Sequence, residues 1–369
     1  MLNVKPRLIA FYLPQYHPIP ENDEWWGKGF TEWTNVTKAK PLFKGHYQPH
    51  IPADLGFYDL RVPETRQAQA DMAREYGIHG FCYYHYWFNG KRMLERPFQE
   101  VLESGEPDLP FCLCWANENW TRTWDGKDNQ ILINQNYSEK DDLEHIRALI
   151  PSFMDPRYIR HDEKPLMLIY RAGELPDPKK TTDIWRNEVQ RAGIGDLFLC
   201  KVESNPKEHT DPGSQGFDAA LEFQPDWGLI KDLKRRSRIA KVFAKFIPQL
   251  FSDAYLNHKI IQYQDLVNSS LEKEIPNYTR FPCVTPRWDN SARKQVGATI
   301  ITGSTPEKYQ SWLIDTYKNN KNTGARELIF INAWNEWAEG NYLEPDMKFG
   351  HDYLVATKNA IDQIAKESY

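Results

Sequence analysis

Eight short apolar segments recur along the chain, and amphipathic segments separate most of them. Each apolar segment has the length of a β-strand, is rich in β-branched or aromatic residues, and is bounded by Gly, Pro or charged residues. Most lack strict alternation of apolar and polar residues, which is typical of parallel strands covered on both faces. The segments are "RLIAFYL" (7–13), "GFCYYHY" (80–86), "PFCLCWA" (110–116), "PLMLIYR" (165–171), "LFLCKVE" (197–203), "AALEFQ" (219–224), "PCVTPRW" (282–288) and "LIFINAW" (328–334).

The segments between these strands predict helices. Residues 63–77 begin with Pro and end with Gly, the asymmetry expected of helix ends. The same pattern fits 139–153, 183–193, 305–320 and 351–369. Eight strands alternating with helices over 369 residues predict an α/β fold of the (β/α)8 TIM-barrel type. A doubly wound sheet is the alternative, but no G-x-G-x-x-G follows the first strand.

We expect residues 1–369 to form a single catalytic barrel with two long connections. One is the loop 14–62 after the first strand, and the other is a helical insertion, 227–278, after the sixth. Between 231 and 245 the insertion carries seven Lys or Arg against one Asp. The basic amphipathic segment 231–251 could rest on anionic lipid, where lipid-linked glycan precursors are built. A solvated helix packed on the barrel explains it equally well.

Charge and composition narrow the partners and the compartment. A net charge of −5 and a pI near 6.1 do not favour a nucleic-acid partner. Four of the five cysteines lie in apolar segments, which indicates buried, reduced thiols. The N-terminus lacks the apolar core of a signal peptide, and no 18-residue apolar stretch occurs. We therefore expect a cytoplasmic protein, peripheral at the inner face of the membrane if 231–251 binds lipid.

In a (β/α)8 barrel the active site lies at the carboxyl ends of the strands. The residues found there combine carboxylates, amides, a guanidinium and indoles, which suit sugar hydroxyls and the apolar face of a pyranose ring. The predicted substrate-binding residues are Tyr12, His85, Trp87, Trp115, Asn117, Glu118, Glu203, Glu222, Arg287, Trp288, Trp334 and Asn335. His46 and His50 are four residues apart, but they flank a proline in a loop, so we expect no metal site there. We also expect no cofactor.

The eighth strand runs into "INAWNEWAEG" (331–340), which places Glu336 and Glu339 at the barrel mouth. Breaking a glycosidic bond requires one carboxyl group as acid and another as base or nucleophile. In a helical turn after Trp334 the two acids would lie on one face, roughly 5–6 Å apart at Cβ. That spacing is close to the separation of a retaining pair, and two nearby carboxylates raise one pKa. The alternative is a solvated helix face.

At four motifs the chain resembles a known family. "FYLPQYHPIPENDEWWGKGFTEWTNV", "GFCYYHYWFNGK", "CWANENWTRTWDG" and "INAWNEWAEGNYLEPD" closely resemble the WbsX family, and the match covers nearly the whole chain. Members of that family are described as glycosyltransferases of surface-polysaccharide biosynthesis, including lipopolysaccharide, and they are similar to glycoside hydrolase family 99. The segment 227–278 is the part of the chain that least resembles the family.

The likeness to family 99 implies a barrel without a metal and a retaining mechanism. By this resemblance Glu336 is the base that deprotonates the 2-hydroxyl of the sugar, and Glu339 is the general acid. The resemblance further implies a reaction that passes through a 1,2-anhydro sugar. Family 99 enzymes act inside mannose-containing glycans, but this chain has Ala338 where those hydrolases commonly place His.

Three functions therefore compete. The resemblance to WbsX implies a glycosyltransferase acting on an oligo- or polysaccharide, and the family 99 likeness implies a retaining endo-acting hydrolase. A non-catalytic glycan-binding barrel is the third. The sequence contains no Asp-x-Asp for a metal–nucleotide site and no Gly-rich phosphate loop. Paired acids in a barrel mouth favour glycosidic-bond chemistry and leave the direction of transfer open.

Overall fold

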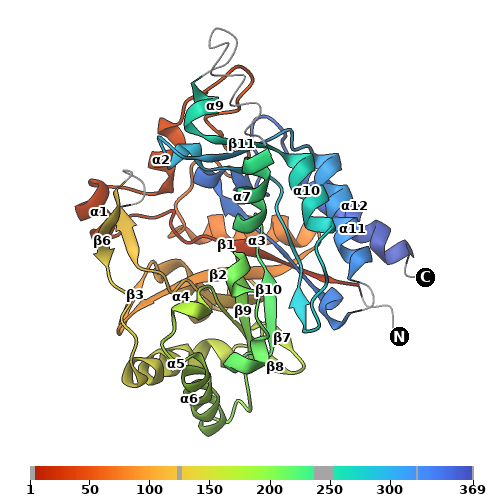
Figure 1. Ribbon diagram of the computed structural model, residues 1–369. Helices are drawn as coiled ribbons and strands as arrows, with labels where there is room; N and C mark the ends of the chain where they lie inside the picture. The colour runs from red at the N-terminus through yellow and green to blue at the C-terminus, as the bar shows by residue number, and fades with distance from the viewer. Residues whose placement is uncertain (1–4, 123–126, 237–252, 321–322, 368–369) are drawn as a thin grey trace.

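The structure, a computed structural model, describes residues 5–122, 127–236, 253–320 and 323–367 (Figure 1). Its centre is a sheet of nine parallel strands whose hydrogen-bonded order is β12-β10-β9-β8-β4-β2-β1-β16-β13. The strands are β1 (Arg7–Tyr12), β2 (Ile78–Phe88), β4 (Phe111–Trp115), β8 (Lys164–Ile169), β9 (Phe198–Glu203), β10 (Ala219–Glu222), β12 (Arg280–Phe281), β13 (Cys283–Val284) and β16 (Leu328–Ile331).

The two ends of this sheet are consecutive pieces of chain. Strand β12 pairs with β10, and β13 pairs with β16. Only Pro282 separates the two short strands, and proline has no backbone N–H to donate to a ladder. The nine strands therefore form a nearly closed barrel, in which β13 lies within the seventh predicted segment, 282–288, and β12 lies just before it. The (β/α)8 prediction is confirmed, and all eight predicted apolar segments contribute to this sheet.

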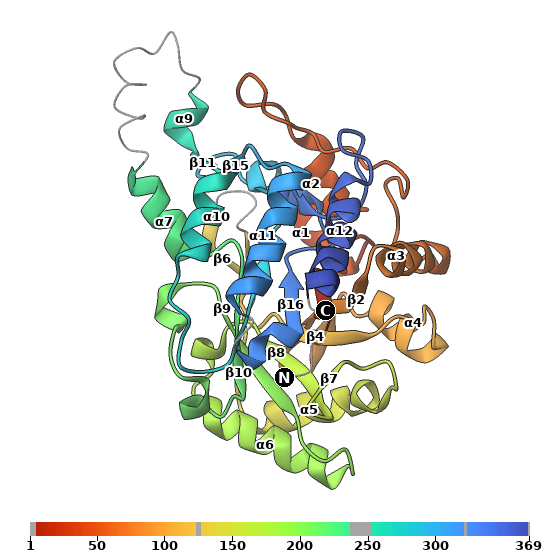
Figure 2. The same cartoon turned by 90° about the vertical axis from the view of Figure 1, so that its right-hand side faces the viewer.

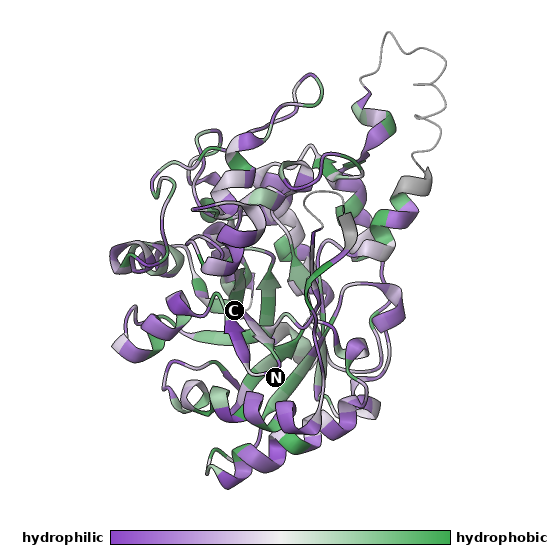
Figure 3. Ribbon diagram, turned by 90° about the vertical axis from the view of Figure 1, so that its left-hand side faces the viewer, coloured by the Kyte–Doolittle hydropathy of each residue, from purple (hydrophilic) through white to green (hydrophobic). Residues whose placement is uncertain are grey.

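Helices cover the outside of the barrel (Figure 2). The helices predicted at 63–77, 139–153, 183–193, 305–320 and 351–369 each have a counterpart in the structure, and Figure 3 shows hydrophobic strands inside a more hydrophilic helical layer. Side-chain caps start several of them: Ser138 accepts from the N–H of Asp141, and Thr305 accepts from the N–H of Lys308. The helices are α3 (Pro63–Glu75), α4 (Arg96–Ser104), α5 (Glu139–Met154), α6 (Pro178–Arg191), α11 (Pro306–Asn319) and α12 (Asp352–Glu367).

The two long connections carry their own structure. Residues 14–62 contain α1 (Pro20–Trp26) and α2 (Glu32–Lys38). Residues 227–278 contain α7 (Trp227–Arg236), α9 (Ala254–Asn257), β11 (Lys259–Gln262) and α10 (Tyr263–Leu271). The insertion is thus not purely helical, because β11 pairs with β15 (Thr299–Thr302), which pairs with β14 (Trp288–Asp289).

Most of the basic segment predicted to meet lipid, 231–251, lies outside the described residues. Within the described ranges, no helix combines the length and the apolar character needed to cross a bilayer. All five cysteines are buried free thiols, as the apolar segments around four of them predicted.

A tight backbone approach between β2 and the start of β4 gives a stability test. A Cβ added to Gly80 would lie 2.2 Å from the carbonyl oxygen of Pro110, and that oxygen accepts from the N–H of Phe81. Gly80→Ala should lower the free energy of unfolding by about 1–3 kcal/mol, because the backbone must move. Gly173→Ala, which meets nothing within 4 Å, is the matched control. Equal denaturant midpoints for the two variants would contradict this packing.

Candidate active site

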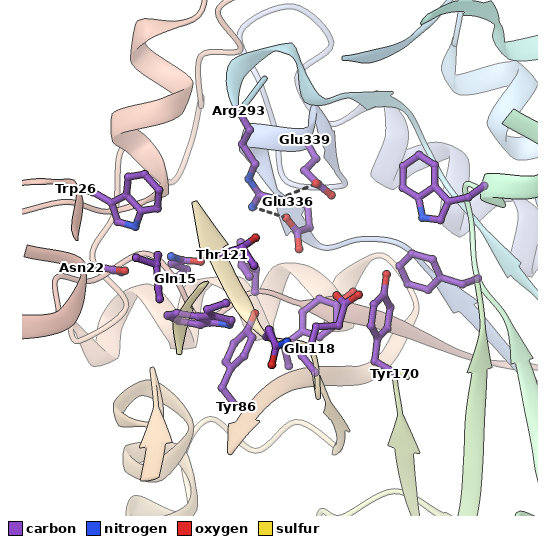
Figure 4. A pocket seen from close by; sticks show the side chains of 18 of the residues that line it. Gln15, Asn22, Trp26, Tyr86, Glu118, Thr121, Tyr170, Arg293, Glu336 and Glu339 are labelled. Atoms are coloured by element: carbon purple, nitrogen blue, oxygen red, sulfur yellow. Dashed lines mark hydrogen bonds and ion pairs between the residues drawn. The ribbon is translucent and has the colours of Figure 1, made fainter. Parts of the chain in front are cut away.

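A cavity of about 280 Å³ opens at the carboxyl ends of the barrel strands (Figure 4). Residues just beyond β1, β4, β8 and β10 line it, together with residues of β2 and of the loops from 14–62 and after β14. The lining residues are Leu13, Gln15, Asn22, Trp26, Tyr84, Tyr86, Ala116, Glu118, Asn119, Trp120, Thr121, Leu132, Tyr170, Phe223, Trp227, Trp288, Arg293, Glu336 and Glu339.

The two acids lie on a short turn after β16. Glu336 ends β17 (Asn335–Glu336), which pairs with β18 (Asn341–Tyr342), and Glu339 ends the 3₁₀ turn Trp337–Glu339. Residues three apart in a 3₁₀ turn lie nearly above one another, which suits two acids facing one cavity.

Buried contacts fix this turn from behind. The Asn335 amide accepts from the N–H of Leu13 at 2.7 Å and donates to its carbonyl at 3.0 Å. Trp337 stacks on Tyr342 with ring centroids 3.7 Å apart, and its Nε1 donates to Glu344 at 2.6 Å. The indole between the acids is therefore locked into the protein, and the carboxylates are left to face the cavity.

A single guanidinium bridges both acids. Arg293, which follows β14, places Nη2 at 3.1 Å from Glu336 Oε2 and Nη1 at 2.7 Å from Glu339 Oε1. Its Nε lies 3.1 Å from Oε2 of a third carboxylate, Glu32. Figure 4 shows the arginine reaching over the two acids. Charge-assisted bonds of this kind fix geometry as well as adding energy.

Burial sets the proton affinity of the pair. Loss of solvation raises the pKa of Glu336 to about 8; the charge of Arg293 opposes this rise, and the charge of Glu339 contributes to it. Burial also raises the pKa of Glu339 above its ordinary value, again opposed by Arg293. A pair so placed retains a proton near neutral pH, and its two protonation steps belong to the pair as a whole.

Aromatic side chains stand on both sides of the acids. Trp26 of α1 lies on one side and Tyr170 on the other (Figure 4). Near Tyr170, the ring of Phe223 lies 5.3 Å away, and Trp227 and Trp288 form a second edge-to-face pair at 5.3 Å. Such surfaces suit the apolar faces of sugar rings, and the amides of Gln15 and Asn22 suit hydroxyl groups.

Of the fourteen sequence-predicted site residues, the structure brings four together at the cavity: Glu118, Trp288, Glu336 and Glu339. Glu118 pairs with Arg171 at 2.6 Å at its edge. The other ten do not line it. Asn117 is fully buried, and its amide bonds to the backbone N–H and carbonyl of Arg171.

Three of the ten, His85, Trp87 and Trp115, lie on the outer face of the barrel against α5. His85 Nε2 lies 2.9 Å from His145 Nε2, and Trp87 donates to Asp141 at 2.9 Å. Trp115 packs edge-to-face on His145 at 4.6 Å. The reason is strand alternation: successive side chains point to opposite faces, so the neighbours Tyr84, Tyr86 and Ala116 line the cavity instead.

The remaining six have protein partners elsewhere. Glu203 accepts from Tyr278 at 2.9 Å, Glu222 pairs with Lys273, and Arg287 pairs with Asp346 at 2.7 Å. Tyr12, Trp334 and Asn335 are buried behind the acid turn, where Tyr12 donates to Gln69 at 2.8 Å. None of these six residues lines the cavity.

Sequence reasoning missed Arg293 and most of the aromatic wall. Gln15, Asn22 and Trp26 come from the long connection and lie within the quoted motif "FYLPQYHPIPENDEWWGKGFTEWTNV", which was a visible signal. Arg293 gave no signal, because nothing in "DNSARKQ" distinguishes it from a surface arginine.

The raised carboxyl pKa values predict a pH dependence of stability. Burial raises the pKa of Glu344 to about 7, and that of Glu336 to about 8, from an ordinary 4.5. The folded state then binds more protons than the unfolded state, so each group's stabilisation is lost as pH rises through this interval. Relative to wild type, Glu344→Gln and Glu336→Gln should gain stability between about pH 4.5 and 7–8, by up to about 1.4 kcal/mol per pH unit.

Denaturant unfolding at several pH values measures this. Glu188→Gln is the control, because Arg147 holds the pKa of Glu188 below its ordinary value and its contribution is constant above pH 4.5. A mutant-minus-wild-type difference that stays flat for Glu336 and Glu344 would contradict their raised pKa values.

Comparison with known proteins places the chain in a family. Residues 8–357 match the family described as Glycosyltransferase WbsX. "Uncharacterized protein WxcX" from two strains of Xanthomonas campestris pv. campestris is 43% identical over 356 residues, 96% of this chain and 49% of that protein. The chain thus spans about half the length of the curated relatives it matches.

Solved structures share the fold at low sequence identity. The GH99 endo-alpha-mannosidase from Bacteroides thetaiotaomicron, in complex with bis-tris propane, aligns with a TM-score of 0.58 and 16% identity over 98% of both chains. A "glycoside hydrolase-like protein" aligns with a TM-score of 0.60 and 14% identity over 98% of this chain and 95% of that one. On the strength of the family match over nearly its whole length, this chain belongs to the family described as Glycosyltransferase WbsX.

Proposed function

We propose that this site makes or breaks glycosidic bonds in surface-polysaccharide glycans with retention of configuration, using Glu336 as base and Glu339 as acid. The observation that carries the proposal is the pair of buried carboxylates bridged by Arg293 at an aromatic-walled barrel mouth. The role of each acid follows the resemblance to glycoside hydrolase family 99.

In the first step Glu336 takes the proton of the sugar 2-hydroxyl. The 2-oxygen then attacks C1 and forms a 1,2-anhydro sugar, while the bond from C1 to the leaving oxygen breaks. Glu339 gives its proton to that oxygen. In the second step Glu339 takes a proton from water or from an acceptor hydroxyl, whose oxygen opens the three-membered ring at C1. Glu336 returns its proton to the 2-oxygen, and two inversions at C1 give net retention.

The raised pKa of Glu336 suits a base, because a carboxylate that binds protons strongly removes one more readily from a hydroxyl. The productive state has Glu336 ionised and Glu339 protonated. Because a carboxyl with a pKa of about 8 is mostly protonated at neutral pH, the proton must pass from Glu336 to Glu339 within the singly protonated pair before Glu336 acts as the base. Both steps move one proton onto one acid and one proton off the other. The pair therefore carries a single negative charge throughout, and the Arg293 guanidinium balances it.

The charges of the cavity favour a neutral glycan over a sugar nucleotide as the donor. At this cavity Arg293 and Arg171 already have acidic partners: Glu336 and Glu339 share Arg293, and Glu118 pairs with Arg171 at the edge. A diphosphate would add negative charge to this surface. A neutral glycan, free or lipid-linked, has no such conflict. Transfer to an acceptor hydroxyl fits the family, and hydrolysis is the second candidate because water can take the acceptor's place.

A panel of mannose-, rhamnose- and galactose-containing oligosaccharides, with sugar nucleotides tested alongside, identifies substrate and direction. Mass spectrometry distinguishes shortened products from elongated ones. A binding-only barrel would retain glycans and turn over none.

On a substrate so identified, Glu336→Gln and Glu339→Gln should each lose roughly 10²–10⁴ in rate, because Gln keeps the shape and cannot transfer a proton. A substrate with an activated leaving group needs little protonation, so it should partly rescue Glu339→Gln only. A 2-deoxy substrate should bind and fail to react. Glu188→Gln, far from the cavity, should keep wild-type rates. Equal rescue of both active-site variants would overturn the roles, and wild-type rates in both would overturn the site.

A further inference from the structure

Glu32 is a fully buried carboxylate beside the active site that does not line the cavity. It is the first residue of α2, and its side chain is 0% exposed. Its Oε2 lies 3.1 Å from Arg293 Nε, while its Oε1 is buried without a hydrogen-bond partner among the described residues. A buried carboxylate is unfavourable without compensation, and here the compensating group is the arginine that bridges the two acids.

The three nitrogens of Arg293 are divided among three carboxylates. Nε faces Glu32, Nη2 faces Glu336 and Nη1 faces Glu339. The guanidinium is planar, so holding Nε fixes the directions in which the two terminal nitrogens point. An arginine anchored in this way can contact both acids at once only in the orientation observed.

The same contacts that hold Glu32 also hold the acid turn. The N–H of Glu32 donates to the carbonyl of Gln15 at 3.1 Å. The ring of the next residue, Trp33, lies 5.5 Å from that of Trp337, between the two acids. Tyr16 packs on Trp33 at 4.7 Å and accepts from the N–H of Trp337 at 3.1 Å. Glu32 thus has a fixed place relative to Glu336 and Glu339.

We propose that Glu32 is a positioning residue that holds Arg293 across the acid pair and, through its negative charge, keeps one proton on that pair. The proposal rests on the proposed function of Glu336 and Glu339, and Glu32 itself does not contact the substrate.

The electrostatics support this role. The charge of Glu32 raises the pKa of both Glu336 and Glu339, in the direction opposite to the effect of Arg293. Three ionised carboxylates around one guanidinium would leave two uncompensated charges in a buried site, whereas one retained proton leaves a single charge. The other titratable groups that face the acids are Tyr16, Tyr84, Tyr86, Tyr170 and Lys294.

The test is the pH–rate profile of Glu32→Gln, which keeps the shape and removes the charge. The pH–rate profile of an acid–base pair is bell-shaped. In Glu32→Gln both limbs of this profile should move to lower pH by about 1–2 units, which is the effect of one charge at this range in a partly screened interior. Glu32→Asp keeps the charge but is one methylene shorter. It should leave the limbs in place and lower kcat, because Arg293 loses its anchor. Glu188→Gln, at a glutamate of α6 that pairs with Arg147 of α5 and Arg191 of α6, should change neither.

A second readout needs no substrate. ¹³C NMR titration of the Glu carboxyl groups, assigned by the signals lost in Glu336→Gln and Glu339→Gln, should show the same downward shift in folded Glu32→Gln. If the wild type turns over no glycan while the titration shifts, the proposed function fails and the positioning role stands. If the two acids prove catalytic while neither profile nor titration moves, the positioning role is overturned. If Glu32→Gln does not fold, Glu32→Asp provides the test. A lowered kcat with the limbs of its pH–rate profile unmoved would support the positioning role of Glu32, and wild-type kinetics in Glu32→Asp would contradict it.

Discussion

The active site depends on one guanidinium shared between two carboxylates. Arg293 contacts Glu336 and Glu339 with separate nitrogens, so it attracts the pair in either of its singly protonated states. Without that cation, burial of two acids on one short turn would favour the neutral forms of both, and neither could act as a base. With it, the pair can hold one proton and pass it between partners. This feature joins the electrostatics of the cavity to the proposed two-step exchange of glycosidic bonds.

The barrel brings these groups together from distant parts of the chain. The acids follow the last strand, Arg293 follows β14, and Glu32 begins a helix in the connection after the first strand. Since β1 and β16 are neighbours, the connection after β1 and the acid turn after β16 leave the sheet side by side. The Asn335 amide ties the two strand ends together through the backbone of Leu13. The long first connection is thus part of the site.

Strand and helix positions were largely predictable from the sequence, because apolar runs of strand length and helix-end residues are local signals. The acid pair was predictable for the same reason: it directly follows an apolar strand. The facing of side chains was not, because a shift of one residue in a strand's end exchanges the inner face for the outer. His85 and Trp115 were assigned to the mouth, whereas Tyr84 and Ala116 line it.

Arg293 lay beyond sequence reasoning for a different physical reason. Its role comes from contacts with residues far away in the chain, including Glu32, and a lone arginine in a polar loop has the same local pattern as a solvated one. At the seventh strand position Pro282 separates β12 from β13, but the predicted segment began at Pro282 and left β12 out. That β12 and β13 would pair with different neighbours and close the sheet depends on the whole barrel.

The stereochemical course of the reaction tests the central claim most directly. ¹H NMR can record the anomeric signal of the first product formed from a glycan of known configuration, before mutarotation, or of the new linkage if an acceptor is used. Two acids that share one guanidinium and act in turn on C1 and the 2-oxygen require retention of configuration. Inversion in the first-formed product would contradict the account, because it would mean a single displacement in which Glu336 and Glu339 do not exchange protons through the sugar.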